Sequence, residues 1–523
     1  MPVLQTLTLL ANIHRGQTVS NIYQIFAQHV QSQPDKTALV FEQQTLSYQA
    51  LNVEVLKLCA HFSRLGLQPG QRVALFAPNG LEYPVVMLAA ARQGLAIVPL
   101  PISLKGGALS VALKKTPVAA VIAWPSIGRI LLADAVIEPT NLISLSQPVA
   151  DEPCWQDIMS EELTVQSMNA PEQKVDVNSP YILTMTSGST GQPKPIVLSQ
   201  QCKISRAFDA TINYYGLSPD EVVLVATPLY HSLAQRGVLM PLMLGATSVI
   251  LPKFTLPKWL AAIETHRVSF LFAVSAQLES LLSSDEEADL SSLRCVVSSS
   301  AVLSAESKQA LLSKLPCRFH ECYGASEVGV VSDFCVSERR DKNGAVGEAL
   351  PFVQVKILDQ QRQTMSAGEI GEIACQTITG FSGYLKMPQQ TQDAFDPQGY
   401  FLTGDLGYLD EDGFLYYVGR KKEVISSGGI NIFPQDIEAV FRKHPKVVDC
   451  VAFGCADRQL GEYIKVVYEQ QDDTDISREL RLLCLSELTD YQQPRSLERI
   501  SALPRTPMGK VLRNDVKTLF SEV

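Results

Sequence analysis

A stretch rich in hydroxyl groups and glycines, ending on a lysine, has the composition of a phosphate-binding loop. Glycines let backbone N–H groups approach an anion closely, hydroxyls add short donors, and the lysine adds a positive charge. The spacing differs from that of a Walker loop, and such a composition is also typical of an ordinary surface loop. The apolar run Tyr181 to Met185 predicts a strand that leads into it. The stretch comprises Thr186, Ser187, Gly188, Ser189, Thr190, Gly191, Gln192, Pro193 and Lys194.

Charged side chains farther along the chain could act on the same anion. Lys510 follows a loop bounded by proline and glycine, residues 503–509, and precedes a predicted helix over 511–520. An amine on such a loop could swing into a cleft, although a lysine near a C-terminus is usually a surface residue. Three further charged residues are, taken singly, typical of turns and solvated loops: Glu327, Asp405 and Arg420.

The elements that must position these residues alternate between short apolar β-type runs and helical patterns over the first four-fifths of the chain. This alternation predicts a layered α/β architecture with mostly parallel sheets. The predicted strands are Val73–Phe76, Ala96–Val98, Val118–Ala123 and Ser248–Leu251, and the predicted helices are Asn52–Leu65, Tyr83–Arg92 and Trp259–His266.

The last hundred residues have a different pattern. Pro434 begins a helical segment that ends at His444-Pro445, and strand-like runs follow at 449–453 and 463–468. We therefore predict a large N-terminal domain of layered α/β sheets over residues 1–421 and a small α+β C-terminal domain over 422–523.

Composition excludes several classes of function. The net charge of −10 argues against binding to nucleic acid or to anionic membrane. No apolar run is long enough to span a bilayer, and the start of the chain (1–13) lacks the basic residue of a signal peptide. The eleven cysteines are scattered, which fits a reducing cytoplasm, and the seven histidines are not clustered as a zinc site requires.

Short motifs along almost the whole chain resemble, in order and spacing, those of the adenylate-forming superfamily. That superfamily comprises acyl- and aryl-CoA synthetases, adenylation domains and luciferases. Besides residues 186–194, the motifs are Leu46-Ser47-Tyr48, Leu95–Pro99, Tyr323-Gly324-Ala325-Ser326-Glu327, Gly371-Glu372-Ile373, Gly383-Tyr384, Thr403-Gly404-Asp405, Gly419-Arg420 and Pro504–Lys510. The resemblance implies a large domain with a β-subdomain, and a mobile small domain.

The resemblance also implies that ATP and a carboxylic acid form an acyl-AMP with release of pyrophosphate. This step brings two anions together, so the site must supply cations and oriented donors. Glu327 would hold Mg²⁺, Asp405 would accept bonds from the ribose hydroxyls, and Arg420 would bind the ribose or phosphate edge. Lys510, Glu327 and Thr186 would be catalytic. The loop from Thr186 to Lys194, together with Ser300, Ala301, Tyr323, Gly324 and Ser326, would complete the nucleotide site.

Two positions depart from the family pattern. Ser298 to Ser300 stand where relatives usually carry a glycine-containing segment along the adenine and the acyl group. Ser326 replaces the usual threonine and keeps its hydroxyl. The first departure is compatible with the backbone contact, and it leaves the detailed shape of the acyl-pocket wall open.

In this family the small domain rotates between two half-reactions. Lys422 aligns with the hinge residue, and Ser427, Gly428 and Gly429 align with a turn that forms the channel for a pantetheine thiol. That thiol would belong to coenzyme A or, alternatively, to a carrier protein. Basic residues proposed for the 3′-phosphate of coenzyme A are Lys421, Lys443 and Lys465.

The segment 228–234 resembles the acyl-pocket motif of acyl- and aryl-CoA synthetases, so a fatty or aryl acid is expected. His231, Ser299 and Gly324 would line the pocket, although a packed histidine fits His231 nearly as well. No carboxylate lies near Ser232 to pair an ammonium group, which argues against α-amino acids. A homologue that binds nucleotide without catalysis is a further alternative.

Overall fold

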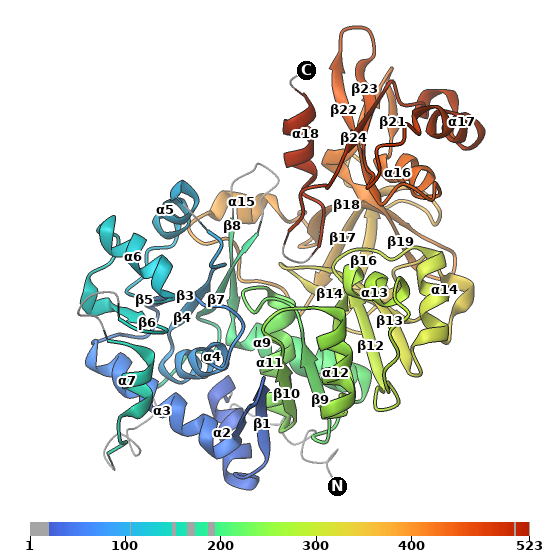
Figure 1. Ribbon diagram of the computed structural model, residues 1–523. Coiled ribbons are helices and arrows are strands. Elements are labelled where there is room, and N and C mark those ends of the chain that lie inside the picture. Colours follow the sequence, from blue (N-terminus) through green and yellow to red (C-terminus); the bar gives the residue numbers. More distant parts are fainter. Residues whose placement is uncertain are drawn as a thin grey trace.

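The computed structural model describes residues 20–104, 106–148, 153–164, 173–186, 194–506 and 509–521. Within these ranges the strands form four sheets, and the last of them belongs to a separate small domain (Figure 1). The segment 1–13, which lacks the basic residue of a signal peptide, lies outside the described residues. No helix in the described ranges has the length and apolar character needed to cross a membrane.

The first sheet has the strand order β6-β5-β3-β4-β7-β8 and is parallel except for its final pair. Its inner strands are buried almost throughout, as expected for a parallel sheet covered by helices. The strands are β3 (Arg72–Phe76), β4 (Ala96–Pro99), β5 (Ala120–Ala123), β6 (Leu142–Ser144), β7 (Pro180–Thr186) and β8 (Lys194–Ser199). The helices around it are α3 (Tyr48–Arg64), α4 (Glu82–Gln93), α5 (Gly106–Lys115), α6 (Pro125–Ala133) and α7 (Trp155–Ser160).

The second sheet has the order β15-β14-β13-β12-β11-β9-β10-β1-β2 and is parallel from β1 to β13. Its strands are β1 (Thr37–Phe41), β2 (Gln44–Ser47), β9 (Val222–Val225), β10 (Thr247–Ile250), β11 (Phe270–Val274), β12 (Cys295–Ser299), β13 (Arg318–Ala325), β14 (Gly329–Cys335) and β15 (Glu348–Ala349). The associated helices are α2 (Ile22–Ser32), α9 (Gln200–Ala207), α10 (Asn213–Tyr215), α11 (Ser232–Leu244), α12 (Leu256–His266), α13 (Ser275–Leu282) and α14 (Ala305–Lys314).

An antiparallel sheet joins the large domain to the small one. It comprises β16 (Val353–Leu358), β17 (Gly371–Thr377), β18 (Phe401–Leu409) and β19 (Leu415–Arg420), with α15 (Pro388–Asp393) between β17 and β18. The single helical turn Lys421–Glu423 follows β19 directly. The chain therefore passes from this sheet to the small domain through a single helical turn.

The small domain packs three helices on one further sheet. Its strands are β20 (Ile425–Ser427), β21 (Ile430–Ile432), β22 (Asp449–Asp457), β23 (Gly461–Glu469) and β24 (Ser496–Ile500), and its helices are α16 (Pro434–Arg442), α17 (Ser477–Glu487) and α18 (Arg513–Ser521). In Figure 1 this domain, coloured orange to red, lies above the large domain, and the loop before α18 points down toward it. The predicted fold class, a large α/β domain with a β-subdomain and a small α+β domain, is confirmed.

Candidate active site

Asp405 lies at the centre of a polar cluster on the antiparallel sheet. Asp405 and Arg420 are cross-strand partners on β18 and β19, and Arg420 Nε lies 2.9 Å from Asp405 Oδ1. Tyr323 Oη, from β13, donates a 2.7 Å hydrogen bond to Asp405 Oδ2. The carboxylate is only 2% exposed, and burial raises its pKa while Arg420 opposes that rise. Three residues expected at the nucleotide site are therefore in direct contact.

Glu327 lies on the turn between β13 and β14. Tyr384 Oη donates a 3.0 Å hydrogen bond to Glu327 Oε1, and Lys194 Nζ lies 5.0 Å from the centre of the Tyr384 ring. One oxygen of the Glu327 carboxylate therefore has a hydrogen-bond donor from the protein. The described residues contain no cluster of three His, Cys, Asp or Glu side chains that could enclose a metal. This donor set fits Mg²⁺, which is usually held by one or two carboxylates, substrate phosphates and water.

Arg206 on α9 fixes the backbone of the turn that carries Glu327. Its Nη2 donates to the carbonyl oxygens of Ser326 and Glu327 at 3.0 and 3.1 Å, and its Nε donates to the carbonyl of Thr379 at 3.0 Å. Hydrogen bonds from a charged donor are among the stronger ones in proteins. The position of Glu327 is therefore set by a side chain that the sequence motifs did not reveal.

The serine segment that replaces the expected glycines lies at the end of β12. Ser300 has φ +82°, in the left-handed region that glycine adopts without strain. The backbone thus keeps the conformation of a glycine although the residue has changed. Gly324 is required for a different reason, because a Cβ at this position would lie 2.0 Å from the carbonyl oxygen of Gly329.

The loop that carries Lys510 contacts the large domain. A Cβ built on Gly509 would lie 2.8 Å from Cβ of Ala276 on α13, so the two backbones approach closely here. Lys510 keeps access to solvent, yet the charges that act on it come from both domains. Desolvation and the positive charge of Arg420 lower the pKa of the Lys510 amine, and Asp405 and Glu423 oppose this. Lys510 therefore belongs to the electrostatic neighbourhood of the Asp405 cluster.

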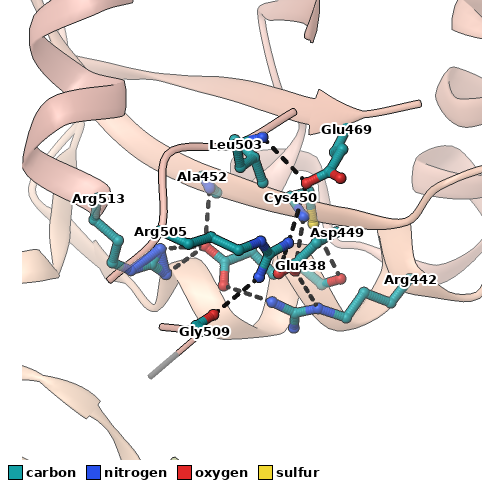
Figure 2. Close-up of polar contacts among 10 residues, drawn as sticks. All are labelled: Glu438, Arg442, Asp449, Cys450, Ala452, Glu469, Leu503, Arg505, Gly509 and Arg513. Atoms are coloured by element: carbon teal, nitrogen blue, oxygen red, sulfur yellow. Dashed lines mark hydrogen bonds and ion pairs between the residues drawn. The ribbon is translucent and has the colours of Figure 1, made fainter. Parts of the chain in front are cut away.

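Two arginines hold this loop to its own domain (Figure 2). Arg505 Nη2 lies 3.0 Å from Asp449 Oδ2 and 3.1 Å from Glu469 Oε2, and its Nη1 donates to the carbonyl of Gly509 at 3.2 Å. Arg513 pairs with the buried carboxylate of Glu438. The loop is thus fixed at both ends, on either side of Lys510.

The residues expected to form the thiol channel lie on the β20–β21 hairpin. Gly428 and Gly429 have φ +58° and +81°, so the turn itself requires glycine. Gly428 N donates to the carbonyl of Leu460 at 2.7 Å, and the turn packs against its own domain. Lys422 is exposed in the single helical turn at the joint.

His231 precedes α11, at the position expected for the acyl pocket. Its ring centre lies 4.4 Å from that of Tyr230, and its buried Nε2 lacks a hydrogen-bond partner among the described residues. Burial lowers the pKa of His231 to about 4, so the ring is neutral at neutral pH. Ser299 ends β12, and Ala301 follows the strained Ser300.

The proposed phosphate loop connects β7 and β8, and Thr186 and Lys194 are register partners at its two ends. Ser187, Gly188, Ser189, Thr190 and Gly191 lie outside the described residues.

Of the lysines proposed for coenzyme A, Lys421 and Lys443 are surface residues paired with Glu372 and Glu487. Lys465 is buried, with its amine on the carbonyl of Phe520, and is therefore not open to a phosphate.

The two domains and their polar cluster define an AMP-binding enzyme. Residues 26–385 match the family described as AMP-binding enzyme, and residues 436–510 match its C-terminal domain. The chain belongs to this family. The predicted enzyme class, an AMP-forming acid–thiol ligase, is confirmed.

Three similar proteins illustrate the range of the family. An indoleacetate–CoA ligase of Aromatoleum aromaticum is 30% identical over 94% of this chain and 97% of its own length. A sulfoacetate–CoA ligase of Cupriavidus necator is 28% identical over 92% of this chain and 94% of its own. The crystal structure of ATP-bound MatB from Rhodopseudomonas palustris has a TM-score of 0.86 and 25% identity, and the match covers 96% of this chain and 99% of that one.

Proposed function

We propose that this chain activates a carboxylic acid with ATP, forming an acyl-AMP and pyrophosphate, and then transfers the acyl group to the thiol of coenzyme A. Its membership of the AMP-binding enzymes and the relatives named as CoA ligases support this reaction. The two relatives are named for different acids, so their names do not identify the acid that this chain activates. That acid is determined by the residues of this chain's own acyl pocket.

In the first half-reaction the acid's carboxylate oxygen attacks the α-phosphorus of ATP, and pyrophosphate leaves. Lys510 Nζ would contact the incoming carboxylate and the bridging oxygen, where negative charge develops. Lys194 and the loop from Thr186 would bind the phosphates. Asp405 would accept from the ribose hydroxyls, with Arg420 and Tyr323 holding its two oxygens in place.

Glu327 would hold Mg²⁺, which when bound neutralises charge on the phosphates. Tyr384 orients one oxygen of Glu327, and Arg206 fixes the backbone on which Glu327 lies. In the second half-reaction the thiol attacks the acyl carbon, and AMP leaves. Rotation about Lys422 would bring the Ser427–Gly429 turn to the site for this step.

The observation that carries the proposal is the position of the Lys510 loop against the large domain, because Asp405 and Arg420 both act on the Lys510 amine. The test is acid-dependent ATP–pyrophosphate exchange over fatty, aryl, short dicarboxylic and amino acids. Exchange with at least one acid is expected, followed by thioester formation with coenzyme A. If no acid supports exchange, the chain is better described as a homologue that binds nucleotide without catalysis. If a thioester forms only on a holo-carrier protein, the acceptor is that carrier protein and not coenzyme A.

A further inference from the structure

Three cationic side chains converge on a small cavity between α9 and α11. Lys203 and Arg206 lie three residues apart and so share one face of α9, and Arg236 faces them from α11. Ser232 and apolar side chains complete the lining. Lys203, Arg206 and Arg236 are 5%, 2% and 8% exposed. The cavity therefore concentrates positive charge in a region that is shielded from solvent.

Lys203 and Arg206 have hydrogen-bond partners, but none of the three cations is paired with a carboxylate among the described residues. Lys203 Nζ donates to Gln235 Oε1 at 2.8 Å, and Arg206 donates to backbone carbonyls. Arg236 lies 5.4 Å from the centre of the Phe272 ring, and its buried Nη1 has no hydrogen-bond partner among the described residues. None of the three forms an ion pair with Asp or Glu in the described part of the chain, and residues 187–193 contain neither.

Such an arrangement is costly unless an anion neutralises it. Burial and the charge of Arg206 lower the pKa of Lys203 well below its usual value, and the same two causes lower the pKa of Arg236 to about 10. Each group thus experiences an excess of positive charge.

The cavity shares residues with the elements that carry the proposed reaction site. Arg206 lines it and also donates to the carbonyl of Glu327, and Ser232 follows His231 at the start of α11. An acid whose carboxylate reaches the α-phosphoryl group could extend its other end toward this cavity. The cavity measures about 10 Å³, which is close to the room that one water molecule needs, so one oxygen atom of an anionic group fits within it and a hydrocarbon tail does not.

We propose that Lys203, Arg206 and Arg236 bind a second anionic group, a carboxylate or a sulfonate, at the far end of a short acid substrate. The substrate class is then a short dicarboxylic or sulfocarboxylic acid, rather than the fatty or aryl acid expected from the motifs. This inference rests on the proposed function for its reaction, but the binding of the anion can be measured separately.

The first experiment compares matched acids in ATP–pyrophosphate exchange. The pairs are malonate with propionate, succinate with butyrate, glutarate with valerate, and sulfoacetate with acetate, and octanoate and phenylacetate are included as fatty and aryl controls. At one chain length the dianionic acid should exceed its partner about 10–100-fold in kcat/KM, the value of one charged hydrogen bond. Comparison of the dicarboxylates with sulfoacetate identifies the anionic group. Equal or better exchange with the monoanionic acids would overturn this inference while leaving the proposed function in place.

The second experiment uses Arg236→Met, which keeps side-chain length and removes the charge. Its kcat/KM for the preferred dianionic acid should fall about 10–100-fold, mainly through KM, and much less for the matched monoanionic acid. Arg236→Lys should restore part of the loss. Lys308→Met removes another buried cation, whose amine donates to the carbonyl of Ala345, and should leave the ratio between the two acids unchanged.

A binding measurement decides the point even without turnover. The preferred dianionic acid should raise the melting temperature of the unmodified chain but not that of Arg236→Met. Arg236→Met itself should be at least as stable as the unmodified chain, because a buried cation without a counter-ion is removed. Equal stabilisation of both proteins by the acid, or an absence of stabilisation by every dianionic acid, would contradict the proposal.

Discussion

The side chain of Arg420 lies 2.9 Å from one oxygen of Asp405, and the two residues are cross-strand partners. Tyr323 occupies the other oxygen, so the carboxylate is oriented by the protein itself. Such preorganisation lowers the cost of ordering the site when a ligand binds.

Asp405→Asn should weaken nucleotide binding. The amide retains the shape of the side chain but loses the negative charge and one of the two oxygens that would accept hydrogen bonds from the ribose hydroxyls. The KM for ATP should therefore rise about 10–100-fold. Arg420 also loses its counter-ion. Isothermal titration with AMP measures the effect directly. Asp410→Asn, in the turn directly after β18, removes an ion pair with Lys342 and provides the control. An equal change in AMP affinity in both variants would argue against a ribose contact.

Lys510→Ala should separate the two half-reactions. Acyl-AMP formation should fall about 10²–10³-fold, the usual cost of one preorganised transition-state donor. Thioester formation from supplied acyl-AMP should change much less, because that step uses the other arrangement of the domains. Lys517→Ala, on the exposed face of α18, is the matched control. Comparable losses in both half-reactions would contradict the two-arrangement mechanism.

The rate of adenylation should depend on the charge of Lys510. Because desolvation and Arg420 lower the pKa of this amine, the protonated form is lost as pH rises through a pKa below the usual lysine value of 10.5. Glu423 raises that pKa, so Glu423→Gln should move the alkaline limb of kcat/KM to lower pH. Glu411→Gln, an exposed carboxylate, should leave the limb in place. An identical pH profile in Glu423→Gln would show that another group controls the limb.

Much of the fold could be predicted from apolar runs and helical spacing, because these patterns report burial directly. Strands β3, β4 and β10 and helices α4 and α12 coincide closely with the predicted segments. Single polar residues such as Asp405 and Glu327 carry no functional signal in isolation, and only their spacing relative to other motifs identified them.

The three cations that line the small cavity could not be identified from sequence patterns. Lys203 and Arg206 lie on a polar helix, where charged residues are ordinarily exposed, and their burial results from packing against α11. Tyr384 belonged to a recognised motif, but its bond to Glu327 joins residues 57 positions apart. One sequence signal was available for Arg236, which lies two residues after the acyl-pocket motif in a largely apolar helix.

Ser300→Gly should stabilise the protein. The serine has φ +82°, and a non-glycine residue in this region costs roughly 1 kcal/mol or more. Glycine removes that strain but gains freedom in the unfolded chain, so a net increase of about 0.5–1 kcal/mol in the free energy of unfolding is expected. Urea denaturation measures it. Ser283→Gly, at φ −81°, should destabilise instead. A loss of stability in both variants would mean that contacts of the Ser300 side chain outweigh the strain.

Arg505 should act as a positioning residue for Lys510. Arg505→Ala removes the contacts with Asp449 and Glu469 and the bond to the carbonyl of Gly509. The loop would then sample more positions, and kcat for adenylation should fall about tenfold or more while the KM for ATP changes little. Half-reaction assays, run beside a measurement of stability, distinguish this from general unfolding.

The control for Arg505 is Arg499→Ala, which removes a surface ion pair with Asp473 in the same domain and should leave adenylation unchanged. Arg505→Lys should recover part of kcat, because one ammonium group can still reach a carboxylate but cannot bridge two carboxylates and a carbonyl at once. Thioester formation from supplied acyl-AMP should remain close to normal in Arg505→Ala. If that half-reaction fell as far as adenylation, Arg505 would stabilise the small domain as a whole and would not orient Lys510.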